Sequence, residues 1–262
     1  MSATISSIHY CPVKSVSFQE NDQSKINKNT GIEGDRIFAF SQNLDLKQSI
    51  LFEKKPDERK GKWNKILTLK NTPVLNKYNF IHKENKLTLL LNEKELITID
   101  VDDIDGRNNL TNKLLELESS LKQDIRLMKN EEYPFFDTSI SNKSEFRNSI
   151  SLLNLNSIKD FENKIERKIE KSIFRGNLYF DYVEAWEERN WIGKTLKIND
   201  ILFKVEKNIP RCVAINLKPK SDDNSINLLK SLKETYNHFE MGVYLTPIED
   251  GEINLQDKIV VK

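Results

Sequence analysis

Short apolar runs separated by polar turns constrain this chain more than any other feature of its sequence. Between residues 51 and 100 they occur at residues 66–69, 78–81, 87–91 and 96–99. Runs of this length at this spacing are typical of antiparallel strands that meander through a barrel or a sandwich. The sequence therefore predicts β-structure in this region, with the charged segment over residues 53–65 as a solvated loop.

Helices and further strands complete the pattern. A stripe of leucines at helical spacing predicts an amphipathic helix over residues 107–121. Two more helices are predicted, one over residues 157–165, where a capping-box pattern begins at Ser157, and one over residues 225–236. A hairpin through residues 199–200 adds a strand pair. We therefore expect an α+β fold that is mostly β.

A polar connection over residues 129–148 separates two halves of the chain. It embeds Pro134-Phe135-Phe136 among charged and amide side chains, which is typical of a link between domains. A chain of 262 residues is long enough for two small domains that share a core. We expect these two associated domains to span residues 1–128 and 129–262.

The composition excludes several classes of protein. The 41 basic and 40 acidic side chains leave a net charge of +1, and a nucleic-acid-binding protein would carry an excess of basic residues. Hydrophobic residues make up 37% of the chain, which is enough to build a core. Two cysteines make no disulfide framework, and neither a signal-peptide pattern nor a long apolar stretch occurs. The sequence therefore predicts a cytoplasmic protein without nucleic-acid or membrane partners.

Cys212 directly follows Arg211, at the start of an apolar run over residues 213–217 that we expect to be a strand. A guanidinium beside a thiol favours the thiolate, which is a soft, monodentate metal ligand. The local pattern leaves open a second interpretation, because most single cysteines are small buried hydrophobic residues. None of the three histidines has another at i, i+4, which argues against a histidine-rich zinc site.

Two other places in the sequence offer groups that bind anions. Lys14 and Ser15 lie at a turn, where the ammonium and the hydroxyl can both reach a phosphate, although a solvated turn is the alternative. Arg36 follows a glycine-containing turn and starts a short apolar run, so that its guanidinium can form a fork on an oxyanion. The alternative for Arg36 is a surface salt bridge with Glu33 or Asp35.

Several short motifs occur in the order of one known family. Along the chain they are Pro12-Val13-Lys14-Ser15, Gly31 to Arg36, Phe174-Arg175-Gly176-Asn177, Trp186, Trp191-Ile192-Gly193, Arg211-Cys212, Gly242 with Tyr244, and Gly251-Glu252-Ile253. In these motifs the chain resembles the MOSC (molybdenum cofactor sulfurase C-terminal) family with its N-terminal companion domain, as paired in amidoxime-reducing proteins. The resemblance implies an N-terminal β-barrel-like domain and a C-terminal MOSC β-barrel with flanking helices.

The resemblance also implies a molybdenum cofactor, Mo-molybdopterin, which has a pterin, a pair of dithiolene sulfurs and a terminal phosphate. Cys212 is implied as the molybdenum ligand and, with Tyr244, as a catalytic residue; simple packing is the alternative role for Tyr244. Lysine, serine and arginine hold the phosphate in the family, and arginine and asparagine contact the pterin. The cofactor-binding residues implied in this chain are Lys14, Ser15, Arg36, Arg175, Asn177 and Arg211.

The chain departs from the family pattern at two places. A Thr-Ser pair that holds the cofactor in some relatives aligns near Arg147-Asn148. The usual threonine-glutamine-arginine segment of the N-terminal domain is replaced around Phe52-Glu53-Lys54-Lys55. The first departure concerns a cofactor contact, and the second concerns the shape of the path by which a substrate enters.

Three functions are weighed on these residues. The first is reduction of N–O bonds in small N-hydroxylated compounds, with electrons from a separate donor of flavin reductase, ferredoxin or cytochrome type. The second is a carrier that delivers molybdenum cofactor or sulfur, with Cys212 bearing a persulfide. The third is a scaffold without a cofactor. The cations at Lys14 and Arg36 favour the reductase, since a sulfur carrier does not need them.

Overall fold

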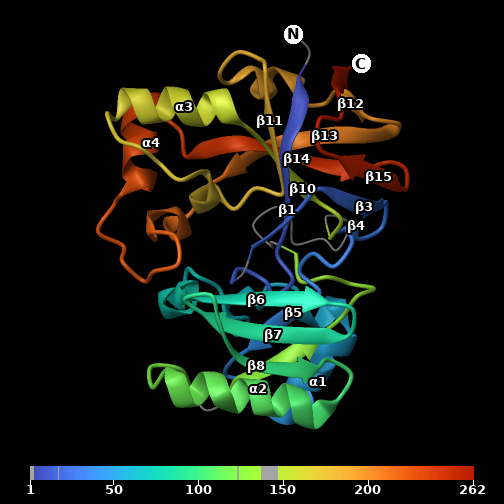
Figure 1. Cartoon of the computed structure of the whole chain (residues 1–262), viewed down its shortest axis with the longest axis vertical. Coiled ribbons are helices and arrows are strands. Elements are labelled where there is room, and N and C mark those ends of the chain that lie inside the picture. The colour runs from blue at the N-terminus through green and yellow to red at the C-terminus, as the bar shows by residue number, and fades with distance from the viewer. Residues whose placement is uncertain (1–2, 17, 123, 137–146) are drawn as a thin grey trace.

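The computed structural model describes residues 3–16, 18–122, 124–136 and 147–262. It has two parts (Figure 1): a large sheet with helices α3 and α4, and below it a smaller part with β5 to β9, α1 and α2. The predicted α+β class with a majority of strands is confirmed. Among the described residues, no helix has both the length and the apolar character needed to cross a bilayer.

The large sheet has eight strands in the order β16-β12-β13-β14-β10-β11-β1-β2. Among the described strands of this sheet, only β10 and β11 pair in parallel. Inward and outward side chains alternate along the first half of β13, as expected for a strand with one buried face. The strands are β1 (Thr4–Tyr10), β2 (Gln19–Asn21), β10 (Ile150–Asn154), β11 (Leu178–Asp181), β12 (Thr195–Ile198), β13 (Ile201–Pro210), β14 (Glu240–Pro247) and β16 (Ile259–Val261).

The two ends of this sheet meet without forming a continuous ladder between the described residues. Thr4 makes an isolated antiparallel bridge with Lys258, and the amide of Ile5 donates to the carbonyl oxygen of Asp257 at 2.9 Å. β2 occupies the rest of this edge of β1, so only the first residues of β1 are open to the chain that leads into β16. The expected closed barrel is therefore corrected to a sheet whose ends touch at one place.

The smaller part is built on a three-stranded antiparallel meander, β6-β7-β8, which confirms the strands predicted at residues 78–81, 87–91 and 96–99. Helix α2 contacts β8 and β9, and its buried Leu110 and Leu114 join the core of this part. A separate pair, β5 with β9, completes it, so the described residues form two small sheets and not a barrel. The elements are β5 (Phe38–Ser41), α1 (Leu46–Lys54), β6 (Tyr78–Lys83), β7 (Lys86–Leu91), β8 (Lys94–Asp100), α2 (Ile104–Leu117) and β9 (Arg126–Lys129).

The segment predicted as a solvated loop over residues 53–65 contains two buried charges instead. Glu53 ends α1 and accepts from Arg107 Nη1 at 2.5 Å and from Arg126 Nη2. Arg59 stacks 4.0 Å above the ring of Phe135. The prediction was wrong because it treated these charges as solvated. Arg107 and Arg126, distant in the sequence, neutralise Glu53, and Arg59 donates to the carbonyl oxygens of Phe52 and Tyr133. Two short helices lie here, η1 (Pro56–Arg59) and η2 (Trp63–Lys65).

The beginning of the chain belongs to the sheets of the C-terminal half. β1 pairs with β11, and β3 (Gln23–Asn27) lies between β4 (Gly31–Ile32) and β15 (Gly251–Asn254). Val13 and Val16 already pack in the core of the smaller part, and the chain returns to that part at β5, after the β3–β4 pairing. The division into domains at residues 128 and 129 stays a prediction, and these pairings cross it.

The predicted helices over residues 157–165 and 225–236 correspond to α3 (Leu155–Lys164) and α4 (Leu228–Tyr236), and the hairpin through residues 199–200 joins β12 to β13. The cap of α3 is Asn154, which accepts from the amide of Asn156 at 3.0 Å, and not Ser157. Four more short helices are η3 (Pro73–Lys77), η5 (Lys171–Phe174), η6 (Glu187–Trp191) and η7 (Val213–Asn216).

Candidate functional site

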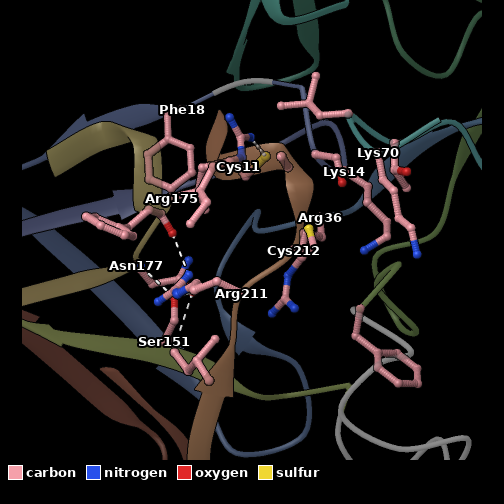
Figure 2. Close-up of a pocket in the computed structure, with 18 of the residues that line it drawn as sticks. Cys11, Lys14, Phe18, Arg36, Lys70, Ser151, Arg175, Asn177, Arg211 and Cys212 are labelled. Atoms are coloured by element: carbon pink, nitrogen blue, oxygen red, sulfur yellow. Dashed lines mark hydrogen bonds between the residues drawn. The ribbon is translucent and has the colours of Figure 1, made fainter. Parts of the chain in front are cut away.

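A cavity of about 460 Å³ opens between the two parts, and residues from both line it (Figure 2). Five basic side chains face one acidic side chain in this lining, so the cavity is cationic. Every site residue predicted from the sequence lies in its wall. These residues are Lys14, Ser15, Arg36, Arg175, Asn177, Arg211, Cys212 and Tyr244.

Cys212 offers an exposed thiol to the cavity. Strand β13 ends at Pro210, and Cys212 precedes η7 without using its side chain to cap that helix. The predicted strand over residues 213–217 is wrong, since the β13–β14 pairing stops at Pro210 and the chain turns away from the sheet there. The buried-hydrophobic interpretation of Cys212 is also excluded, because a packed core residue would not be exposed.

Arg211 holds the wall beside this thiol. Its Nε donates to the carbonyl oxygen of Met241 at 3.0 Å, and its Nη1 donates to that of Phe174 at 2.7 Å. The guanidinium thereby ties β14 to η5, and it lies 5.7 Å from the centre of the Phe174 ring. Arg211 thus connects two segments of the wall in addition to contributing positive charge.

Arg36 forms an ion pair with Asp35, but the pair is buried and does not lie on the surface. Its Nε lies 2.5 Å from Asp35 Oδ2, and its Nη2 donates to the carbonyl oxygen of Ser149 at 2.7 Å. The predicted ion pair with Asp35 therefore exists inside the cavity wall. Burial acts to lower the pKa of Arg36, but Asp35, with smaller effects from Tyr244 and Cys11, raises it, so the guanidinium stays charged.

Lys14, Ser15 and Lys70 bring further cationic and hydroxyl groups into the cavity. The amide of Lys14 donates to the carbonyl oxygen of Phe38 at 2.8 Å, and Ser15 has a left-handed backbone with φ of 65°. The side chains of Lys14 and Lys70 enter from different segments (Figure 2). Lys70 was missed from the sequence because residues 66–69 were taken as a strand, whereas Ile66 makes only an isolated bridge with Ser41 and a turn begins at Leu69.

The side-chain groups of Asn177 form hydrogen bonds within the protein itself. Its Oδ1 accepts from Ser151 Oγ at 2.8 Å and from the Ser151 amide at 3.1 Å, and its Nδ2 donates to the carbonyl oxygen of His9 at 3.3 Å. These bonds join β1, β10 and the start of β11 at the cavity wall (Figure 2). A ligand that paired with this amide would have to replace some of them.

Arg175 lies against a second cysteine that the sequence did not single out. Its backbone is left-handed, with φ of 51°, and its Nη2 donates to Cys11 Sγ at 3.4 Å. The guanidinium lies 4.9 Å from the centre of the Phe18 ring. In the sequence Cys11 is one of two cysteines that make no disulfide framework, and it directly precedes the Pro12-to-Ser15 motif. The structure instead places Cys11 and Cys212 on the same cavity.

The cavity also contains hydroxyl groups near the sequence departure at Arg147-Asn148. Neither of those two residues lines the cavity, but the next residue, Ser149, does. The Oγ of Ser149 is buried and has no hydrogen-bond partner among the described residues. Protein atoms enclose this hydroxyl, although Ser149 itself lines the cavity. The phenol of Tyr244 lines the same cavity from β14 and is 7% exposed.

The second departure from the family pattern, which concerns the path of substrate entry, lies away from the cavity. None of the four residues over 52–55 lines the cavity, whereas Thr68, Leu69 and Lys70 do. The described residues contain no group of three or more histidine, cysteine or carboxylate side chains able to hold a metal ion. A metal in this cavity would therefore need most of its ligands from a cofactor.

Comparisons with known proteins agree with this architecture only in part. The model of the MOSC domain matches residues 136–260. YiiM from Geobacillus stearothermophilus is 15% identical with a TM-score of 0.35, and YiiM from Escherichia coli is 13% identical with a TM-score of 0.34. Each alignment covers 43% of this chain and 53% of the other, so the chain spans about half the length of the YiiM chains.

YuaD from Bacillus subtilis is 9% identical with a TM-score of 0.45, and the alignment covers 100% of this chain and 96% of that one. No curated protein matches this chain. The family match includes Arg175, Asn177, Cys212 and Tyr244, and it leaves Lys14 outside. Residues 136–260 are therefore a MOSC domain, a member of a family that is associated with the molybdenum cofactor.

Proposed function

We propose that the cavity binds the molybdenum cofactor and that the protein reduces N–O bonds of small N-hydroxylated compounds. One observation carries this proposal: the exposed thiol of Cys212 shares a cavity with cations from both parts of the molecule. A thiolate suits a soft metal, and a phosphate needs cationic and hydroxyl donors. Both kinds of group are present, and the volume is in the range of cofactor sites.

Different residues of the cavity would bind the two ends of the cofactor. Lys14, Ser15 and Arg36 would hold the phosphate, and Cys212 would ligate the metal. Arg175 would lie along the pterin. Arg211 and Asn177 would act mainly as supports, because their side chains are bonded to the surrounding backbone and to Ser151. This donor set fits the cofactor.

When bound, the cofactor supplies a two-electron couple at its metal. Reducing an N-hydroxylated base to the parent base takes two electrons and two protons and releases one water molecule. The chain's own contribution is to hold the substrate in a cavity with few acidic groups and to move the protons. Tyr244, a largely buried phenol in the lining, is the group we assign to hold or donate one of them. The electrons would come from a separate flavin, iron–sulfur or cytochrome protein.

Metal analysis tests the proposal. Protein produced in a host that makes the cofactor should contain molybdenum, and the Cys212→Ser variant should lose most of it. Cys11→Ser is the matched control, because it changes the other thiol of the same cavity and should retain the metal. The loaded protein should reduce benzamidoxime with an artificial reductant, and Cys212→Ser should not.

The carrier hypothesis predicts a different result for the same samples. Sulfane sulfur on Cys212 without molybdenum would support a carrier and would overturn the reductase. Molybdenum at equal levels in the wild type and in Cys212→Ser would show that this thiol is not the ligand. Protein that holds neither metal nor sulfur after exposure to the cofactor would support the scaffold.

A further inference from the structure

The segment that follows Cys212 joins the two parts of the molecule, and we name residues 212–223 the strap. It begins at the cavity, forms η7 and continues as a loop to the smaller part. Ile215 is buried in a core cluster of the larger part, where η7 contacts α4 and η5, whereas Leu217 is buried in the core of the smaller part. Residues only two positions apart are therefore held by different cores.

The side-chain amide of Asn76 fastens the far end of the strap. Asn76 lies in η3 of the smaller part, and its Nδ2 donates to the carbonyl oxygen of Lys218 at 2.8 Å and to that of Ser221 at 2.7 Å. The two bonds match the two hydrogens of the amide. The strap loop is compact here, because the Ser221 amide donates to the Lys218 carbonyl at 3.2 Å.

We propose that Asn76 is a positioning residue for Cys212, acting through the strap. Cys212 makes no capping bond with its side chain, so the backbone of η7 sets the direction of its thiol. The amide of Ile215 donates to the Cys212 carbonyl at 3.1 Å, which links the cysteine rigidly to the part of the strap that both cores hold. The smaller part thereby fixes the thiol of the MOSC domain at the wall of the cavity.

The role of this thiol as a metal ligand rests on the proposed function, but its direction can be measured without a metal. Iodoacetate and iodoacetamide alkylate the same thiolate, and only iodoacetate is an anion. A thiol held in a cationic cavity favours the anionic reagent. The ratio of the two alkylation rates at Cys212 therefore reports whether the thiol faces the cavity, and peptide mass spectrometry separates it from Cys11.

The experiment compares variants of Asn76 after removal of any bound cofactor. Asn76→Leu keeps the approximate shape of the side chain and removes both donors, and the rate ratio at Cys212 should fall by about threefold or more as the thiol leaves the cationic wall. Lys220→Met is the matched control. It breaks the exposed ion pair between the strap and Glu93, at 2.9 Å, and should leave the ratio unchanged.

A purely structural role would lower the melting temperature of Asn76→Leu and leave the ratio as in the wild type, which would overturn the proposal. If Asn76→Leu does not fold, Asn76→Ser takes its place, since a hydroxyl can serve one of the two carbonyls and should give a smaller fall. A wild-type ratio in Asn76→Ser would also overturn it. A fall in the ratio in a protein that never binds molybdenum would support the positioning role and refute the proposed function alone.

Discussion

Asp35 neutralises Arg36 inside the wall of the cavity: their side chains are 1% and 13% exposed, and Oδ2 lies 2.5 Å from Nε. Asp35 Oδ1 also accepts from the amide of Cys11 at 2.7 Å. The Asp35→Asn variant keeps the shape but leaves the guanidinium without its counter-charge. Removing one partner of a buried pair is costly, and we expect a loss of about 3 kcal/mol in the free energy of unfolding. Urea unfolding measures it.

The control for this prediction is Glu33→Gln. Glu33 pairs with Lys25 at 3.9 Å on the surface, where both side chains are exposed. Such pairs contribute about 0–1 kcal/mol. Equal losses of unfolding free energy in Asp35→Asn and Glu33→Gln would show that the buried pair stabilises the protein no more than the surface pair.

Gly242 lies where the backbone of β14 passes against β10. Its φ is +79°, and a β-carbon would lie 2.6 Å from the carbonyl oxygen of Leu152 and 2.9 Å from Leu153 Cγ. Gly193 has a similar φ of +81° but nothing within 4 Å of a β-carbon. Gly193→Ala should therefore cost about 1 kcal/mol for the backbone alone. Gly242→Ala should cost more, by roughly 1–3 kcal/mol of overpacking; equal losses in thermal or urea unfolding would contradict this.

His9 makes the stability depend on pH. Its pKa is lowered to about 4, chiefly by burial and also by Lys171, with Glu20 acting in the opposite direction. Between pH 6.5 and pH 4 the unfolded chain takes up a proton at this residue that the folded protein does not, so stability falls as the pH falls. His9→Phe retains a ring beside Phe18 and Tyr179. Its stability relative to wild type should rise as the pH is lowered through this range.

Unfolding by urea at several pH values between 7 and 4.5 measures the effect. Carboxylates titrate in both proteins, so the difference between the two curves isolates the histidine. Parallel curves for wild type and His9→Phe would show that His9 is protonated equally in the folded and unfolded states.

Lys70 should strengthen the binding of anions to the cavity. Inorganic pyrophosphate is a suitable probe, and Lys70→Met keeps the apolar stem while removing the charge. Losing one charge-assisted contact should weaken binding by about tenfold in calorimetry at low salt. Lys122→Met is the control, because Lys122 bonds to Asn43 on the exposed surface, away from the cavity lining. Equal affinity in Lys70→Met and wild type would remove Lys70 from the site.

The fold could be predicted from the sequence where local patterns decide it. The leucine stripe of α2 and the alternating runs of β6 to β8 bury their own apolar faces, so periodicity alone identifies them. The ends of the large sheet could not be predicted, because the bridge of Thr4 to Lys258 depends on residues at opposite ends of the chain. Glu53 was misjudged for the same reason, since Arg107 and Arg126 neutralise it from a distance in sequence.

The same distinction between local patterns and distant contacts applies to the residues of the site. Lys14, Arg175 and Cys212 lie in motifs whose order along the chain pointed to a shared cavity, and the structure brings them to one. Lys70 and Cys11 could not be found this way. Lys70 follows an apolar run that resembles a strand, and the thiol of Cys11 gains a role only through the approach of Arg175 across the fold. Contacts of this kind are absent from any local pattern.

The placement of β1 has a consequence for synthesis of the protein. This strand is synthesised more than a hundred residues before its ladder partner Leu178–Asp181. Until then its apolar side chains, among them Ile5 and Ile8, have no sheet to cover them. The nascent chain therefore needs chaperones to protect it. The large sheet can form only after the second half of the chain has been translated, whereas the β6-to-β8 meander can form early.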